Sequence, residues 1–121
     1  MNDWRNGSEG QIGSDIDAYQ EWTRTTAIYP KEKSLEYTLF GLIGEVGELA
    51  NKYKKVIRDK GGIIDESFCQ EMSKEAGDII WYWTRFLDEL GISCSNVLWQ
   101  NFIKLNDRKE RGVIKGEGDN R

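Results

Sequence analysis

Two pairs of acidic residues, each spaced three positions apart, are the first feature of the sequence that points to chemistry. Glu45 and Glu48 lie in the segment GLIGEVGELANKYKK, and Glu75 and Asp78 lie in the segment EAGDIIWY. Three positions are close to one turn of an α-helix, so each pair lies on one helical face. If the two helices pack as an antiparallel hairpin across the short DKGG break, the four carboxylates face one another.

Four carboxylates that converge in a partly dry groove repel one another, and they either take up protons or gather divalent cations. Carboxylate oxygens suit Mg²⁺, for which Mn²⁺ can substitute. The sequence has no histidine, which excludes His-ligated zinc or iron as well as Ser-His and Cys-His nucleophiles. We therefore expect a magnesium site with the ligands Glu45, Glu48, Glu75 and Asp78.

Cationic side chains near these acids indicate a phosphorylated substrate, because protein-bound Mg²⁺ commonly shares its coordination with phosphate groups. The candidate phosphate contacts are Lys52, Lys55, Lys104 and Arg108. Phosphoanhydride hydrolysis is then the expected reaction, with water as the nucleophile. Glu48 and Glu71 are both candidates for the general base, and a bound metal that activates water without either of them stays an alternative.

Glycines accompany both acidic pairs, although a glycine inside a helix costs about 1 kcal/mol relative to alanine. Gly44 and Gly47 lie beside the first pair, and Gly77 lies inside the second. We expect these glycines to let the two helices approach closely. A single acidic residue on a helix is usually a solvated surface group, but two glycine-bearing acidic pairs on consecutive helices favour a site.

Four helices can position these residues. A polar leader is expected over residues 1–14, a helical domain over 15–111 and a mobile, glycine-rich tail over 112–121. Ser14 with Asp17 resembles a capping box for a first helix that runs to about Ile28, and Ser34, Asp65 and Ser93 or Ser95 can cap the next three. Gly91 is the expected C′ residue of the third helix.

Apolar residues at helical spacing define the expected core. The second helix carries Leu35, Leu39, Leu42, Val46, Leu49, Tyr53 and Val56, and the third carries Phe68, Met72, Ala76, Ile79, Trp83, Phe86 and Leu90. Tyr82 continues the acidic stripe of the third helix, and Asn101 shares a face with Lys104 on the fourth. Without a strand pattern, the fold class is all-α, an antiparallel four-helix bundle.

Composition excludes several other classes of protein. The chain has 121 residues and a net charge of −4, which argues against a nucleic-acid groove. It offers neither a membrane-spanning segment nor the apolar core of a signal peptide, so we expect a cytoplasmic protein. Cys69 and Cys94 are expected to be buried thiols. Five Trp, five Tyr and four Phe are numerous enough that some rings can face another subunit.

The segments GLIGEVGELANKYKK, EAGDIIWYW and QNFIKLNDRKERG together resemble the MazG-like family of all-α nucleoside triphosphate pyrophosphohydrolases, from about Tyr19 to the C-terminus. The resemblance implies hydrolysis between the α and β phosphates to a nucleoside monophosphate and inorganic pyrophosphate (diphosphate). It also implies that the ExxE and ExxD pairs hold magnesium, that Tyr82 lies near the nucleotide, and that Asn101, Lys104 and Arg108 meet phosphate or sugar.

Further implications of the resemblance concern assembly and substrate. Family members form dimers or dimers of dimers, so a homodimer or homotetramer is expected to complete the bundle and its pockets. Short phage-type members often act on dGTP or GTP, which makes guanine the first choice and the host cytoplasm the expected location for a phage-encoded chain. The ending GVIKGEGDNR resembles the terminus of short members, which implies an active-site role for Lys115 and Arg121.

Two other functions fit the same sequence. A helical nucleotide-sensing or interaction module without catalysis would use the apolar seam for partner binding. A phosphoribosyl-ATP pyrophosphohydrolase would share the scaffold and differ only in its substrate. The third helix, with WYWTRF where many relatives carry smaller aliphatics, departs from the family pattern at the place where base preference and subunit contacts are decided.

Overall fold

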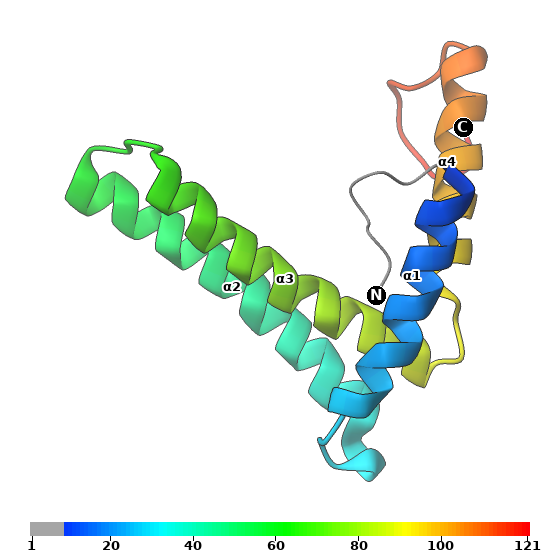
Figure 1. Ribbon diagram of the computed structural model, residues 1–121. Helices are drawn as coiled ribbons and strands as arrows, with labels where there is room; N and C mark the ends of the chain where they lie inside the picture. Colours follow the sequence, from blue (N-terminus) through cyan, green and yellow to red (C-terminus); the bar gives the residue numbers. More distant parts are fainter. Residues whose placement is uncertain (1–8) are drawn as a thin grey trace.

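The computed structural model describes the backbone of residues 9–121 and the side chains of residues 15–121, and this part of the chain is helical without strands (Figure 1). The α-helices are α1 (Glu9–Thr23), α2 (Ser34–Lys60), α3 (Glu66–Glu89) and α4 (Cys94–Glu110), with 3₁₀ turns η2 (Arg24–Thr26) and η3 (Lys31–Lys33) between α1 and α2. The expected all-α class with four helices is confirmed. None of the described helices is long and apolar enough to cross a membrane.

Helix α1 differs from its predicted bounds at both ends. It begins at Glu9 and ends at Thr23, whereas the sequence places the start near Ser14 because Gly10 and Gly13 are poor helix formers. Residues 1–8 of the expected leader lie outside the described residues. Residues 9–14 are helical, so the predicted boundary at residue 14 does not coincide with a change of structure.

Helices α2 and α3 form an antiparallel hairpin whose ends follow simple rules. Gly61 closes α2 in the left-handed region with φ of 60°, which glycine adopts without steric penalty. Asp65 caps α3 by accepting a hydrogen bond from the Phe68 amide at 2.8 Å. The cap prediction for Ser34 is wrong, because Ser34 is already helical and continues the turn η3 without a side-chain cap.

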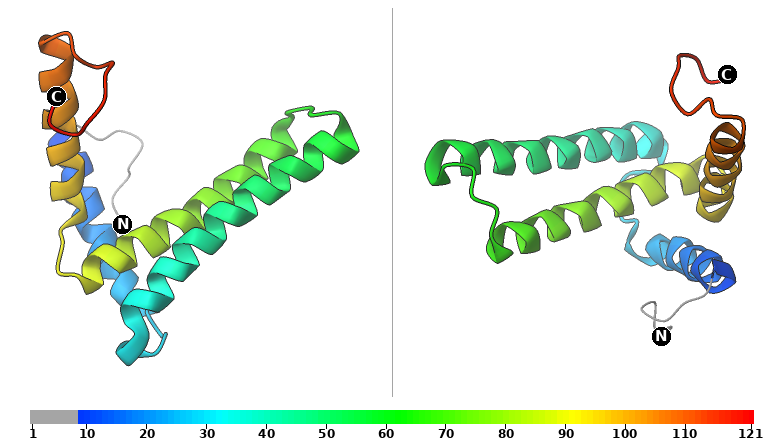
Figure 2. Two further views of the ribbon diagram at one scale, coloured as in Figure 1. Left: turned by 180° about the vertical axis from the view of Figure 1, so that it is seen from behind. Right: turned by 90° about the horizontal axis from the view of Figure 1, so that it is seen from above.

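The four helices pack against one another as two arms that diverge (Figures 1 and 2). The hairpin α2–α3 is one arm, and α1 and α4 lie side by side in the other. The arms meet at the C-terminal end of α3, where both α1 and α4 contact it. Helix α4 therefore stands away from the hairpin instead of lying along it.

The apolar seam of α2 is only half covered within one chain. Leu42, Leu49 and Val56 are partly buried, but the other four seam residues, Leu35, Leu39, Val46 and Tyr53, are 38–48 % exposed. On α3 the predicted buried face is partly buried except at Ala76 and Leu90, which are exposed. Among the described side chains, the buried apolar ones are Tyr29 and Cys94, while Cys69, expected to be buried, is exposed.

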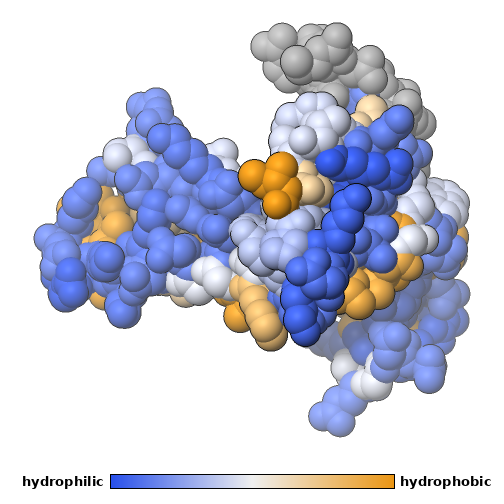
Figure 3. Space-filling model, turned by 90° about the horizontal axis from the view of Figure 1, so that it is seen from below, coloured by the Kyte–Doolittle hydropathy of each residue, from blue (hydrophilic) through white to orange (hydrophobic). Residues whose placement is uncertain are grey.

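A second apolar stripe on α2 faces solvent. Phe40, Ile43 and Ile57 are 66, 60 and 56 % exposed, and they follow helical spacing through Gly47 and Ala50. Helix α4 adds Trp99 and Phe102, which stack on each other and are half exposed. Figure 3 shows apolar side chains reaching the surface on both arms. Large contiguous apolar patches on a protein surface are typical of interaction sites.

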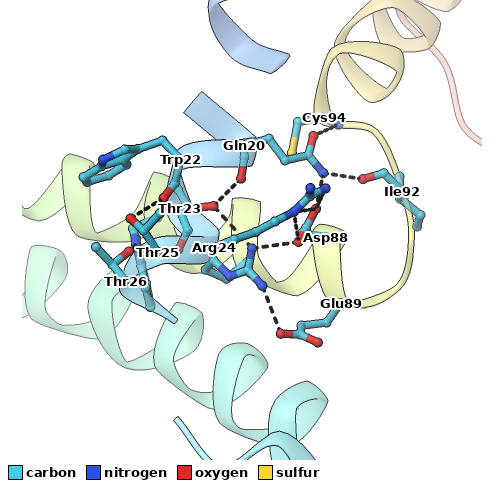
Figure 4. A network of polar contacts seen from close by, with 12 residues as sticks. Gln20, Trp22, Thr23, Arg24, Thr25, Thr26, Asp88, Glu89, Ile92 and Cys94 are labelled. Atoms are coloured by element: carbon cyan, nitrogen blue, oxygen red, sulfur yellow. Dashed lines mark hydrogen bonds and ion pairs between the residues drawn. The ribbon is translucent and has the colours of Figure 1, made fainter. Parts of the chain in front are cut away.

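A polar network fixes the junction of the two arms (Figure 4). The Arg85 guanidinium, 3 % exposed, donates to Thr23, Tyr29, Asp88 and Glu89. Gln20 donates to Asp88 and to the carbonyl of Ile92, and it accepts from the amide of Cys94 at 2.8 Å. The network thus connects α1, α3 and the start of α4, and its buried charge is paired as burial requires.

Asp88 is the anionic centre of this network. Hydrogen bonds from Arg24, then from Arg85 and Gln20, lower its pKa from 3.8 to about 2 against the opposing effect of burial. A carboxylate with a lowered folded-state pKa stabilises the fold above its unfolded pKa, and this stabilisation is lost as the pH falls through the folded pKa. The junction should therefore weaken in acid.

Replacing Asp88 by Asn tests this contribution, because the change removes the charge and keeps the shape. We expect Asp88→Asn to lower the free energy of unfolding by up to about 2 kcal/mol at pH 7, and to have a much smaller effect near pH 2, where about half of the wild-type carboxyl groups are protonated. Urea denaturation followed by Trp fluorescence, at both pH values and at one protein concentration, measures the difference.

The matched control is Asp107→Asn, since Asp107 is 57 % exposed where it pairs with Arg111 and surface pairs contribute little. An equal loss in both variants, or a loss in Asp88→Asn that is as large at pH 2 as at pH 7, contradicts the assignment.

Candidate functional site

Three of the four predicted metal ligands meet between α2 and α3. Glu45 from α2 and Glu75 and Asp78 from α3 each place one carboxylate oxygen within 4.8 Å of the others. Glu75 is 8 % exposed, Glu45 is partly buried and Asp78 is exposed. This acidic trio is open to solvent on the Asp78 side and closed behind Glu75, which is a suitable arrangement for a cation that enters from water.

Opposite electrostatic effects act on two of the carboxylates in the trio. Burial raises the pKa of Glu45, and a hydrogen bond with Glu75 and the charges of Asp78, Glu75 and Glu48 raise it further. The Lys52 ammonium, 2.7 Å from the Glu75 carboxylate, lowers the pKa of Glu75. The Lys52 ammonium therefore offsets part of the repulsion among these carboxylates.

Lys52 lies inside the site, where the sequence places a phosphate contact. Its ammonium group also approaches the Glu71 carboxylate at 3.5 Å, so Glu71, a candidate base, joins the edge of the trio through Lys52. The Lys52 side chain is 33 % exposed. A divalent cation bound to the trio would replace this ammonium at Glu75 and leave it free to turn toward an anion.

Glu48 and Lys55 stand farther from the trio. Glu48 is exposed and acts on Glu45 through its charge, but its carboxylate is not part of the trio. Lys55 is exposed, and its charge helps to lower the pKa of Asp59, near the hairpin turn. Three of the four carboxylates predicted to converge therefore do so, and the fourth, Glu48, lies near them on α2.

Tyr82 and Gly41 form the tightest contact between α2 and α3. A Cβ atom at Gly41 would lie 2.1 Å from Cε1 of Tyr82, so only glycine fits. Burial, then Tyr37, and then the charges of Glu45 and Asp78 raise the pKa of Tyr82, so the phenol lies within electrostatic reach of the trio. Its contact with a nucleotide stays a prediction.

The predicted role of the other glycines is wrong within one chain. A Cβ atom added at Gly44, Gly47 or Gly77 would meet nothing within 4 Å. Sequence reasoning missed Gly41, although the spacing could have predicted its contact with Tyr82. Gly41 lies four residues before Glu45, and Tyr82 lies four residues after Asp78. Antiparallel helices bring such positions together once Glu45 and Asp78 are opposite each other.

The α4 residues predicted to contact substrate are not brought to the trio. Asn101, Lys104 and Arg108 belong to the other arm (Figure 1). Lys104 and Arg108 instead pair with Asp119. A cavity of about 480 Å³ lies apart from both the trio and these α4 residues, and it is lined by residues of the polar network such as Gln20, Arg24 and Asp88. Gln20 and Arg24 both donate hydrogen bonds to Asp88.

Substitution of single glycines separates the two kinds of position. Gly41→Ala should lower the free energy of unfolding by about 1–3 kcal/mol, because its methyl group overlaps Tyr82. Gly77→Ala should raise it by up to about 1 kcal/mol, because the position is open in a helix interior. Thermal unfolding of both variants is the measurement, and each is the other's matched control. Equal effects of the two substitutions would contradict the α2–α3 register described above.

Comparison with known proteins adds a phage relative. Over 112 residues the chain is 43 % identical to the Gene 37 protein of Mycobacterium phage L5, an alignment that covers 88 % of this chain and 98 % of that protein. No protein-family model matches the chain, and no solved structure matches it. The identity extends over nearly all of the relative, so the chain belongs to the same family as the Gene 37 protein of Mycobacterium phage L5.

Proposed function

We propose that this protein is a magnesium-dependent nucleoside triphosphate pyrophosphohydrolase, which cleaves NTPs or dNTPs between the α and β phosphates to a nucleoside monophosphate and inorganic pyrophosphate (diphosphate). The observation that carries the proposal is the acidic trio of Glu45, Glu75 and Asp78, which two neighbouring helices hold within 4.8 Å beside the ammonium of Lys52. The resemblance to the MazG-like enzymes supplies the reaction, and dGTP or GTP is the first choice of substrate.

The trio fits a hard divalent cation. All three donors are carboxylate oxygens, which Mg²⁺ and Mn²⁺ prefer. Burial first, and then the neighbouring carboxylates, raise the pKa of Glu45, and a bound cation would offset the repulsion among these carboxylates. Glu45, Glu75 and Asp78 would hold the metal, with Glu48 as a further ligand from the next turn of α2. When bound, magnesium would neutralise phosphate charge and acidify a bound water.

The remaining residues of the hairpin have roles that follow from their places. Glu71, at the edge of the trio beside Lys52, and Glu48 can each accept the proton of an attacking water. Lys52 and Lys55 would neutralise phosphate oxygens. Tyr82 lies at the Gly41 end of the trio, where an aromatic ring can stack on a nucleobase.

A second copy of the chain would complete both the fold and the site. The seam of α2 and the stripe of Phe40, Ile43 and Ile57 are exposed, and the open positions at Gly44 and Gly47 allow another helix to approach closely. We propose a homodimer or homotetramer with a MazG-like bundle. Because α4 lies apart from its own hairpin, Asn101, Lys104 and Arg108 would serve the trio of a partner subunit.

Product analysis tests the reaction. The protein is incubated with each NTP and dNTP and Mg²⁺, and the products are separated by ion-exchange chromatography. We expect a nucleoside monophosphate and pyrophosphate as the products. Mn²⁺ should replace Mg²⁺, and EDTA should stop turnover. Glu75→Gln and Asp78→Asn should each lower kcat about 100-fold or more, because charge stabilisation at the reacting phosphates is lost.

Glu66→Gln is the matched control for these substitutions, since Glu66 begins α3 and is exposed. The proposal fails if no nucleotide is turned over, if orthophosphate and nucleoside diphosphate are the only products, or if Asp78→Asn or Glu48→Gln keeps full activity.

Mixing two inactive variants tests the shared site. If the trio of one subunit works with α4 of its partner, a dimer of one Glu75→Gln chain and one Arg108→Gln chain has one intact site and one doubly altered site. Random mixing after mild denaturation and refolding makes half of the dimers mixed, so about a quarter of the wild-type activity should return. Each variant refolded alone is the control, and a mixture as inactive as its components would show that each site uses one chain.

A non-catalytic helical module remains the second candidate, and the exposed apolar stripes favour it independently of the acids. It would bind a partner through α2 with no response of Trp fluorescence to millimolar Mg²⁺. A phosphoribosyl-ATP pyrophosphohydrolase would differ from the leading proposal only in the substrate turned over. We place the reaction in the cytoplasm of the host cell, where its substrates are.

A further inference from the structure

The last nine residues of the chain fold back along α4 and do not extend away from it (Figures 1 and 2). The reversal begins at Gly112, with φ of 72°, which a residue with a side chain rarely adopts. The sequence indicates a mobile tail here because residues 112–121 hold four charged residues and three glycines. The structure instead gives the tail a defined set of partners.

The terminal residue holds the tail closed. The Arg121 guanidinium donates to the carbonyls of Val113, Ile114 and Gly118 at 3.1, 2.9 and 2.6 Å. Arg111 at the end of α4 donates to the carbonyl of Arg121 at 2.7 Å. Ile114 is 49 % exposed, so polar contacts rather than apolar burial dominate the tail, and such contacts exchange readily with water and ions.

Asp119 is the point at which the tail meets a pair of cations. Its carboxylate lies 3.0 Å from the Lys104 ammonium and 3.3 Å from the Arg108 guanidinium, and its carbonyl accepts a further hydrogen bond from Arg108. Lys104 and Arg108 are one helical turn apart on α4. Arg108 is 5 % exposed and Asp119 is 77 % exposed at its side chain.

These contacts are those of an anion site that is already filled. A guanidinium and an ammonium converge on one carboxylate, and the same donors in the same geometry suit a phosphate group. The carboxylate brings one negative charge, whereas a diphosphate or triphosphate chain brings several. Surface ion pairs such as Lys104–Asp119 are weak, so a more highly charged anion can replace Asp119.

We propose that Lys104 and Arg108 form a polyphosphate-binding site that the tail occupies with Asp119, and that a polyphosphate opens the tail by taking the place of this carboxylate. The class of anion rests on the proposed function, while the site and its present occupant come from α4 and the tail. The low pKa of Asp119, caused first by Lys104, means that the occupant is charged at neutral pH.

Pyrophosphate binding to the full-length protein in EDTA tests the inference without turnover or metal. Calorimetry gives the affinity, and ¹⁵N spectra of the tail amides report whether the tail moves. We expect pyrophosphate to shift the amides of Gly112, Gly116 and Gly118 toward disordered values. Asp119→Asn should bind pyrophosphate about threefold more tightly or better, and Arg121→Gln, which loosens the tail, should act in the same direction.

Lys104→Gln should weaken binding, and Lys109→Gln is its matched control because Lys109 is an exposed cation on the same helix. The inference is overturned if pyrophosphate binds without shifting the tail amides, if Asp119→Asn and Arg121→Gln leave the affinity unchanged, or if Lys109→Gln weakens binding as much as Lys104→Gln. The binding assay contains no metal and no nucleotide, so its outcome does not depend on hydrolysis. If the separate product analysis shows no hydrolysis, the proposed function is refuted and the binding result is unaffected.

Discussion

The register of α2 against α3 is the constraint on which the candidate site depends. At one end Gly41 receives the ring of Tyr82, a position that admits no side chain. Toward the other end the rings of Tyr53 and Phe68 are in contact, with centroids 5.4 Å apart. A slip of one residue would turn each acidic side chain by about 100° around its helix, so these contacts decide whether the carboxylates meet.

The hairpin leaves much of its apolar surface exposed within one chain. Large side chains along α2 and α4 remain open to solvent, and the fully buried side chains described are small: Thr23, Thr38, Thr84 and Cys94. Hydrophobic burial is the main favourable term in folding. The exposed apolar residues and the open glycines of α2 lie on the same helix as Glu45, so the proposed assembly would bear on the integrity of the site.

Local rules and long-range contacts divide what the sequence could predict. The helix caps at Asp65 and Ser93 and the C′ glycine Gly91 follow from neighbouring residues, and the structure confirms them. The meeting of Glu45 with the Glu75 pair needs only the assumption of a hairpin. The divergence of the arms depends on Arg85 binding Thr23 and Tyr29, partners 62 and 56 positions away, and no periodic pattern encodes such a contact.

The polar character of the junction has a consequence for how two copies can meet. Hydrogen bonds and ion pairs depend on direction, whereas apolar contacts tolerate sliding. Arg85, Asp88 and Gln20 join the arms through such directional contacts. The angle between the arms is therefore fixed more narrowly than the position at which the exposed apolar surfaces of the arms could pack. In the proposed homodimer or homotetramer, the fixed angle between the arms would limit which symmetric pairings can form, and the exposed apolar stripes would supply the contact area.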